Sequence, residues 1–150
     1  MTEMVRLDRL AKRFGPVHAV EDVSFTVARG EVLGFLGPNG AGKSTTMRML
    51  TGFLTPTSGH ASVLGHDVVT APIEVKKQLG YLPEGAPLYG DMTARAFLRF
   101  CGQMRGLSGR QLKQRMDAAV ERTQLDEVLH RPIETLSKGF KRRVGLAQAI

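Results

Sequence analysis

The sequence predicts an α/β fold with a β-rich start, an alternating core and a helix-rich region after it. Residues 3–9 and 20–27 alternate apolar and polar side chains, which is typical of half-buried strands in an antiparallel sheet. Residues 32–36 (VLGFL) are almost wholly apolar, which predicts a strand buried on both faces, as in a parallel sheet. After Thr93, apolar residues recur at helical spacing. This order of elements favours an α/β class over an all-α or all-β one.

The other elements of the core follow in chain order. A Gly-rich loop precedes a helical pattern that runs from Lys43 to about Thr51. Residues 61–65 (ASVLG) and 79–82 (LGYL) are expected to form short strands. Pro72 favours a helix that begins there, because its fixed φ suits the first helical turn.

Helices are expected in the last third of the chain. Thr93 is the expected N-cap of the first, whose apolar stripe is Phe97, Phe100, Cys101 and Met104. Ser108 and Gln111 have the spacing of a capping box for the second, whose apolar face is Leu112, Met116, Ala119 and Val120. A third helical pattern starts near Phe140 and reaches Ile150 with no Gly or Pro stop signal.

Composition limits the class of protein. The chain has 150 residues, 42% of them hydrophobic, which suits one modest domain or part of a larger one. No apolar run is long enough to span a bilayer, and the start has no signal-peptide pattern. The single Cys101 is expected to be reduced and packed in the core. The net charge of +7 comes largely from the region that runs from Arg105 to the end of the chain, so the charge by itself does not identify partners.

The segment GPNGAGKST, residues 37–45, carries the sharpest chemical signal. It fits the phosphate-loop pattern G-x-x-x-x-G-K-[ST] through Gly37, Gly42, Lys43 and Ser44, between an expected strand and an expected helix. Such a loop turns backbone N–H groups toward phosphate oxygens at a helix N-terminus. Lys43 can reach the β- and γ-phosphates, and Ser44 can bind Mg²⁺. The pattern predicts a nucleotide site in a P-loop NTPase core, but kinases, GTPases and transport ATPases share it.

The ordered motifs resemble those of the ATP-binding cassette family, the ATPase subunits of ABC transporters. GPNGAGKSTT is close to the family's phosphate loop, and RFGPVHAVEDVSFTVARGEVLGFLGPNG is similar to the family's opening. The resemblance covers essentially the whole chain, and implies ATP and Mg²⁺ as cofactors. It implies a nucleotide site made of Phe14, Val20, Gly37, Pro38, Asn39, Gly40, Ala41, Gly42, Lys43, Ser44 and Thr45. Phe14 would stack on adenine with Val20 as an apolar contact; the alternative for Phe14 is an aromatic packed at the end of a strand.

Residue 84 is the main departure from the family pattern. LGYLPEGAPLY resembles the family's Q-loop, where the family usually has Gln and this sequence has Glu84. The resemblance implies catalytic roles for Lys43 and Glu84 and metal binding by Ser44 and Glu84. A carboxylate can bind Mg²⁺ through oxygen but donates no hydrogen bond, so the orientation of the attacking water is in question. Glu at this position resembles the subgroup that serves drug and antibiotic exporters.

LSKGF, residues 136–140, resembles the family signature LSGGQ. Leu136, Ser137 and Gly139 match it, whereas Lys138 and Phe140 depart from it. The resemblance implies that this segment contacts ATP bound to the opposite subunit of a head-to-tail dimer, through a second helix N-terminus. Taken alone, the segment is a weak signal, and the start of a Ser-capped helix is the better explanation.

The resemblance also implies an organisation. We expect a β subdomain and P-loop core over 1–82, the Q-loop and a helical subdomain over 83–135, and the signature with its helix over 136–150. No apolar strand ending in Asp-Glu occurs in the sequence, and no histidine follows the signature. We therefore expect a truncated chain, the N-terminal part of a longer ATPase, that binds ATP but turns it over poorly.

The expected function is an ATP-hydrolysing subunit that powers transport, and specifically export. Its expected partners are a separate integral membrane permease and a second ATPase subunit, with no nucleic acid, at the cytoplasmic face of the cell membrane. Two alternatives stay open. One is a soluble ABC-type ATPase that acts on nucleic acid or ribosomes, and the other is a non-hydrolysing nucleotide-binding fragment.

Overall fold

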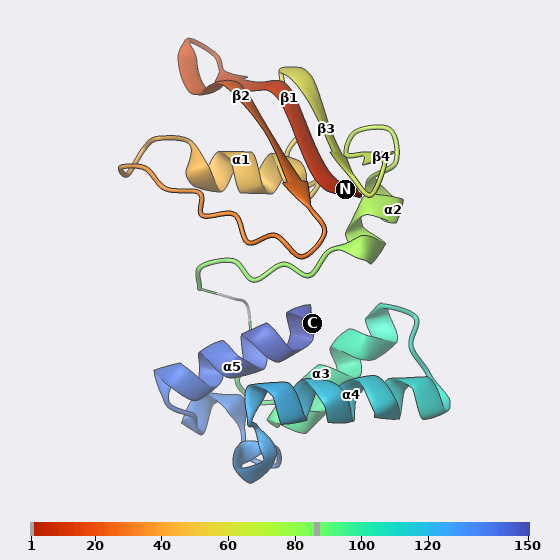
Figure 1. Cartoon of the computed structure of the whole chain (residues 1–150). Coiled ribbons are helices and arrows are strands. Elements are labelled where there is room, and N and C mark those ends of the chain that lie inside the picture. Colours follow the sequence, from red (N-terminus) through yellow and green to blue (C-terminus); the bar gives the residue numbers. More distant parts are fainter. Residues whose placement is uncertain (1, 86–87) are drawn as a thin grey trace. The chain divides into compact units, whose positions relative to one another are not determined.

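The protein divides into two units, Met1–Leu79 and Gly80–Ile150, which we call the N-terminal and C-terminal units (Figure 1). The structure is a computed structural model that describes residues 2–85 and 88–150. Each unit has its own hydrophobic cluster.

The N-terminal unit is built on a four-stranded antiparallel sheet. Its strands are β1 (Glu3–Phe14), β2 (Val17–Ala28), β3 (Ser58–Val63) and β4 (His66–Asp67), in the order β2-β1-β3-β4. The alternating patterns at 3–9 and 20–27 therefore predict the first two strands correctly. The strand expected at 61–65 begins earlier, at Ser58, because β3 follows β1 along more of its length.

Two helices cover one face of this sheet (Figure 1). They are α1 (Lys43–Leu50) and α2 (Pro72–Gln78), and both begin where the sequence predicts. Met49 and Leu50 of α1 and Val75 of α2 are buried with Leu10 and Val63 of the sheet in one cluster. Alternate strand residues supply the apolar face of the sheet, as a half-buried antiparallel sheet requires.

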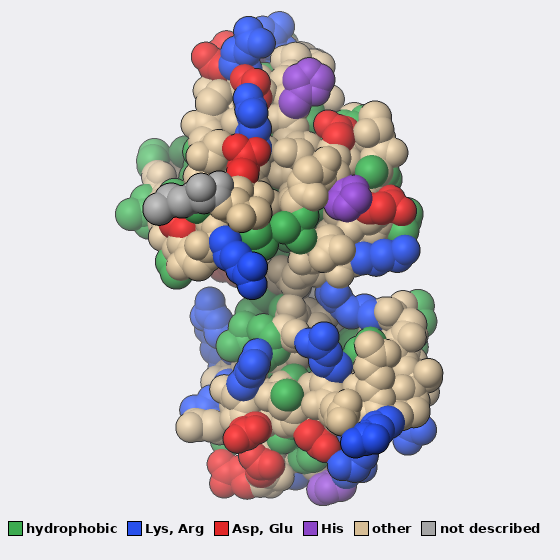
Figure 2. Space-filling model, turned by 45° about the vertical axis from the view of Figure 1, so that its right-hand side comes forward, with side chains coloured by type: hydrophobic (Ala, Val, Ile, Leu, Met, Phe, Trp, Pro, Cys, Tyr) green, Lys and Arg blue, Asp and Glu red, His purple; other side chains and the backbone are tan. Residues whose placement is uncertain are grey.

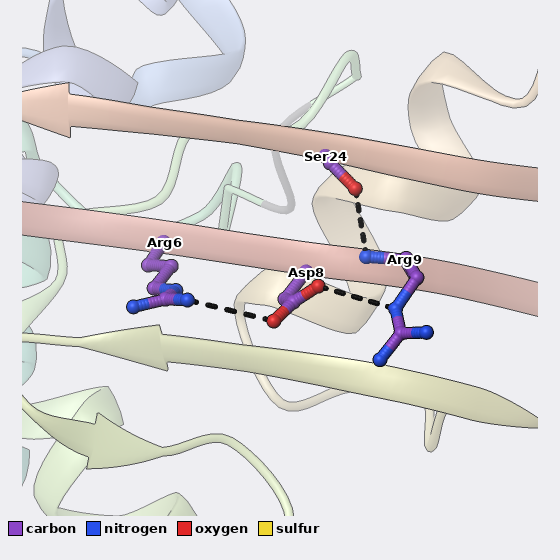
Figure 3. A network of polar contacts seen from close by, with 4 residues as sticks. All are labelled: Arg6, Asp8, Arg9 and Ser24. Atoms are coloured by element: carbon purple, nitrogen blue, oxygen red, sulfur yellow. Dashed lines mark hydrogen bonds and ion pairs between the residues drawn. The ribbon is translucent and has the colours of Figure 1, made fainter.

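The opposite face of the sheet is polar, and the backbone of β1 is irregular there (Figure 3). Arg9 has φ of 47°, the register shifts between Leu7 and Leu10, and the Arg9 amide donates to Ser24 Oγ at 2.8 Å. Asp8 lies within 3.5 Å of the guanidinium groups of both Arg6 and Arg9. These exposed ion pairs contribute little to stability; the Ser24 hydroxyl, in contrast, satisfies a strand amide that the bulge turns away from its neighbour.

A tight turn links β4 to α2. The Asp67 carboxylate accepts hydrogen bonds from the amides of Val69 and Thr70 at 2.8 and 2.9 Å. Partial burial acts to raise the pKa of Asp67, but these bonds outweigh it and hold the pKa below its ordinary value. Asp67 therefore stabilises the turn in its ionised form.

Two expected strands are absent from the described structure. Residues 32–36 form no strand, and Val32 and Leu36 are 95% and 93% exposed. Residues 79–82 are also irregular. Both predictions are wrong for the same reason: a strand exists only when neighbouring strands take its hydrogen bonds, and no described strand pairs with either segment.

The C-terminal unit is helical. It contains α3 (Ala94–Met104), α4 (Gly109–Thr123), α5 (Lys138–Ala149) and two short 3₁₀ turns, Asp126–Val128 and Ile133–Thr135. Phe97, Leu125 and Val144 are among the residues of its buried cluster. No helix of the described residues is long and apolar enough to cross a membrane.

The two predicted helix starts in this unit differ in outcome. Thr93 caps α3, with its hydroxyl accepting from the Ala96 amide at 3.1 Å, as predicted. Ser108 precedes α4 but its side chain makes no capping bond, so the capping-box prediction is wrong. Gly109, the first residue of the helix, has φ of 51°, which departs from the helical backbone that a capping box requires.

The predicted apolar stripe of α3 is only partly buried. Phe97 is in the core, whereas Met104 is 74% exposed, and Phe100 meets the ring edge of the exposed Tyr89. Cys101 packs against the cluster as expected. Burial raises the pKa of the Cys101 thiol, and the nearby charge of Arg105 offsets part of that effect.

Candidate functional site

The phosphate loop, residues 37–45, lies in the N-terminal unit and leads directly into α1. Gly42 is the N-cap of α1 and has φ of 83°, and Gly40 has φ of 86°. Side chains with a Cβ adopt this left-handed region at a cost, so the backbone itself explains why the pattern needs glycine at position 42 and why glycine also suits position 40. Ser44 lies on the exposed first turn of the helix, where amide groups have no partner within the helix.

The end of the loop is held against β2. A Cβ on Gly42 would lie 2.4 Å from the Ala19 carbonyl oxygen and 2.8 Å from Val20 Cγ2. Val20 is buried in the core beneath this contact. Val20 therefore supports the loop from below. The predicted contact of Val20 with a base stays a prediction.

Lys43 turns back over the loop that precedes it. Its ammonium group donates to the carbonyl oxygens of Gly37 and Pro38, both at 2.6 Å. The same Pro38 oxygen accepts from the Ala41 amide at 3.2 Å, which closes a small turn inside the loop. The arrangement holds a positive charge at the N-terminus of α1, and the ammonium group and the first amides of the helix are the donors that a polyphosphate requires.

Phe14 ends β1 at the tip of the β1–β2 hairpin, opposite Val17. Phe14 is 49% exposed and belongs to neither buried cluster, so the alternative of a packed core aromatic is wrong. The Lys12 ammonium lies 5.2 Å from the ring centroid and also donates to the Thr55 carbonyl oxygen at 2.7 Å. The sequence reasoning missed Lys12, although its i,i+2 spacing places it on the same strand face as Phe14.

Glu84 and the signature segment lie in the C-terminal unit. Glu84 is exposed, and it borders a hollow of about 840 Å³ together with Glu134, Lys138, Lys141 and Arg142. The two departures from the family pattern that carry charge, Glu84 and Lys138, are thus brought to the same hollow.

The signature segment, residues 136–140, begins α5. Ser137 is its N-cap, and its hydroxyl accepts from the Phe140 amide at 3.3 Å, so the interpretation as a Ser-capped helix start is correct locally. Leu136 is buried, and the Arg143 guanidinium lies 5.1 Å from the centroid of the Phe140 ring. Lys141 donates to the Glu134 carbonyl oxygen at 2.9 Å and fixes the first turn of α5. The predicted contact of this segment with ATP of another subunit stays a prediction.

The residues fit ATP and Mg²⁺ chemically at the phosphate loop. Lys43 supplies the charge, the glycines allow close approach of the backbone, and the exposed Ser44 supplies a hydroxyl oxygen that suits a hard cation. Among residues 2–85 and 88–150, there is no group of three or more His, Cys, Asp or Glu side chains that could hold a metal ion. The assignment of Ser44 and Glu84 to a metal stays a prediction.

Comparison with known proteins identifies the family. The sequence model of the ABC transporter family matches residues 20–150. The chain is 40% identical over 144 residues to the "Probable multidrug ABC transporter ATP-binding protein YbhF" of Escherichia coli, covering 96% of this chain and 25% of that protein. It is 36% identical over 147 residues to the "Linearmycin resistance ATP-binding protein LnrL" of Bacillus subtilis, covering 98% and 47%. The chain thus spans less than half the length of these two relatives.

A solved structure agrees with these relatives. The chain matches one titled "Structure of ATP binding subunit of ABC transporter" with a TM-score of 0.86 and 31% identity, over 97% of this chain and 61% of that one. A second match, to cbiO1 of Clostridium perfringens, has the same TM-score at 24% identity, over 99% of this chain and 61% of that one, and supports the fold alone. The expected P-loop ABC ATPase fold is confirmed, and the chain belongs to the ABC transporter family.

Proposed function

We propose that this chain binds ATP with Mg²⁺ at the phosphate loop and forms part of an ATP-hydrolysing subunit that powers transport. The observation that carries the proposal is the Lys43 ammonium, held 2.6 Å from two loop carbonyl oxygens at the N-terminus of α1. A cation at a helix start, between two left-handed glycines and an exposed hydroxyl, suits the β- and γ-phosphates of a nucleotide bound with Mg²⁺.

The proposed partner is a separate integral membrane permease, and the proposed direction is export, at the cytoplasmic face of the membrane. Support comes from the names of relatives, which include a multidrug transporter protein and a linearmycin resistance protein. The segment at 136–140 is proposed to contact ATP of a second subunit in a head-to-tail dimer, where the Ser-capped start of α5 would meet an anion. Hydrolysis by residues 1–150 alone is expected to be weak, because the sequence contains no apolar strand that ends in Asp-Glu.

A nucleic-acid function has less support. On the face in Figure 2, Lys and Arg side chains are interspersed with Asp and Glu and do not form one continuous basic surface. Binding to nucleic acid usually requires such a surface and depends steeply on salt.

The test is the effect of ATP and Mg²⁺ on thermal unfolding of Lys43→Ala. A ligand that binds only the folded state raises its apparent stability, by about 2.7 kcal/mol at one hundred times Kd. We expect the wild type to show this shift and Lys43→Ala to lose most of it. Lys77→Ala is the control, because Lys77 is an exposed lysine on α2 of the same unit. An unchanged shift in Lys43→Ala, or an equal loss in Lys77→Ala, would contradict the proposed site.

A further inference from the structure

We propose that Lys12 is a positioning residue for nucleobase recognition. This proposal rests on the proposed nucleotide site. The Lys12 ammonium covers one face of the Phe14 ring and leaves the opposite face for the base. The ring would then lie between a cation and a purine, with its orientation set before the nucleotide arrives.

The first support is that two contacts hold the Lys12 ammonium in place. It donates to the Thr55 carbonyl oxygen at 2.7 Å and lies over the Phe14 ring, 5.2 Å from the centroid. The turn that supplies Thr55 is itself tied to β1, because the Thr57 amide donates to the Ala11 oxygen at 2.9 Å and the Thr57 hydroxyl accepts from the Arg13 amide at 3.0 Å. The lysine is therefore fixed against the ring by the same turn that braces the end of the strand.

The second support is that the ring and the phosphate loop share one side of the hairpin. Lys12 lies opposite Val20 in the register of β1 with β2, and directly opposed residues project from the same face. Phe14 lies on the same side, because the Lys12 ammonium lies over its ring even though the register shifts between Lys12 and Arg13. Val20 in turn lies beneath Gly42 of the loop. A nucleotide with its phosphates at the loop would thus have its base on the side where Phe14 stands.

The third support is the exposure of the ring. Phe14 remains 49% exposed although the Lys12 ammonium lies over its ring. The cation therefore covers part of the ring and leaves the rest accessible. A cation over an aromatic face is attracted by the ring's negative quadrupole. It also opposes any rotation of the ring that would present its edge to a base, and stacking requires a face.

This role differs from a direct contact between Lys12 and phosphate. If Lys12 acts through the ring, its removal changes the affinity only for ligands that carry a base. If it acts as a charge, its removal weakens any polyphosphate alike, and more so at low salt. The two roles are separated by comparing Mg²⁺–ATP with Mg²⁺–tripolyphosphate, which has the phosphates and no base.

The experiment is isothermal titration of the 150-residue chain with both probes. Lys12→Met keeps the length of the side chain and removes its charge. We expect it to weaken ATP binding about two- to fivefold, the range of an exposed cation–π contact, and to leave tripolyphosphate binding unchanged. Phe14→Leu should weaken ATP binding by about fivefold or more, as loss of a base stack does. Lys12→Arg should restore most of the ATP affinity, because a guanidinium also lies well over a ring.

A double variant completes the test. In Phe14→Leu, adding Lys12→Met should cause no further loss of ATP affinity, because the lysine no longer has a ring to position. Equal losses for ATP and tripolyphosphate in Lys12→Met, or independent losses in the double variant, would overturn the proposal, as would unchanged ATP affinity in Lys12→Met. Tripolyphosphate binding by each variant also reports an intact phosphate loop. If the wild type binds neither probe, the proposed nucleotide site itself has failed, which is a different result.

Discussion

Gly42→Ala should destabilise the N-terminal unit much more than Gly40→Ala, although both glycines lie in the same loop. Both have nearly the same left-handed backbone, with φ of 83° and 86°. They differ in their surroundings: a Cβ on Gly42 would lie 2.4 Å from the Ala19 oxygen, and a Cβ on Gly40 would meet nothing within 4 Å. The pair therefore separates backbone strain from steric contact.

The magnitudes follow from these surroundings. Alanine in the left-handed region costs about 1–2 kcal/mol, and the loss of chain freedom in the unfolded state returns about 0.4–1 kcal/mol. Gly40→Ala should therefore lower the free energy of unfolding by about 1 kcal/mol. Gly42→Ala must in addition move the loop or β2 by most of an ångström, and forced overpacking of this kind costs about 1–3 kcal/mol. Its total should be about 2–4 kcal/mol.

The assay is urea unfolding followed by far-ultraviolet circular dichroism, with both variants compared at an unchanged m-value. A change in m would indicate that the two units no longer unfold as in the wild type. Equal losses for the two variants would refute the reasoning, because the contact with Ala19 would then not constrain the loop. Titration with tripolyphosphate should show the larger loss of affinity in Gly42→Ala as well, since the loop is the part that must move.

Three further expectations concern local features of each unit. Thr93→Ala should lower the free energy of unfolding by about 1 kcal/mol in urea titrations, whereas Ser108→Ala should have almost no effect, because only Thr93 makes a capping bond. The lowered pKa of Asp67 means that its stabilising contribution is present above its unfolded pKa and is lost as pH falls through the folded value. The stability of Asp67→Asn should therefore depend less on pH in this acid range. An acid transition identical to that of the wild type would contradict this. The raised pKa of Cys101 means that stability falls as pH rises from the ordinary thiol pKa toward the folded value, because only the unfolded thiol ionises there. Thiol labelling of the native protein should be slower than that of the urea-unfolded chain at the same pH. Equal labelling rates would argue against burial of the thiol.

Local signals predicted most of the elements that form. The alternation at 3–9 and 20–27, the Pro72 start and the Thr93 cap depend on neighbours within a few residues, and all of them are found. The phosphate loop was also predicted from a local signal. Its glycines at 40 and 42 allow the left-handed backbone that the structure has there.

The predictions that fail depend on partners that a sequence pattern does not contain. An apolar run such as 32–36 shows that a segment suits a buried strand, but only a neighbouring strand makes it one. Ser108 fails for a subtler reason, since the left-handed Gly109 that follows it removes the geometry that the capping box needs. Lys12 could have been found, because a cation two residues from an aromatic on a strand shares its face, but spacing alone does not say that Thr55 holds it there.

The two hydrogen bonds of Lys43 change how a substitution at that position is to be interpreted. In this structure the ammonium group already bridges the oxygens of Gly37 and Pro38, so it is part of the scaffold of the loop as well as the proposed ligand for phosphate. Lys43→Ala would perturb the reference state and the bound state together. The loss of affinity measured for it is then the difference between two environments of one side chain, and it is not the energy of the contact between lysine and phosphate. The Lys43 ammonium therefore preorganises the loop before any phosphate binds, and a bound phosphate would share this group with the two carbonyl oxygens.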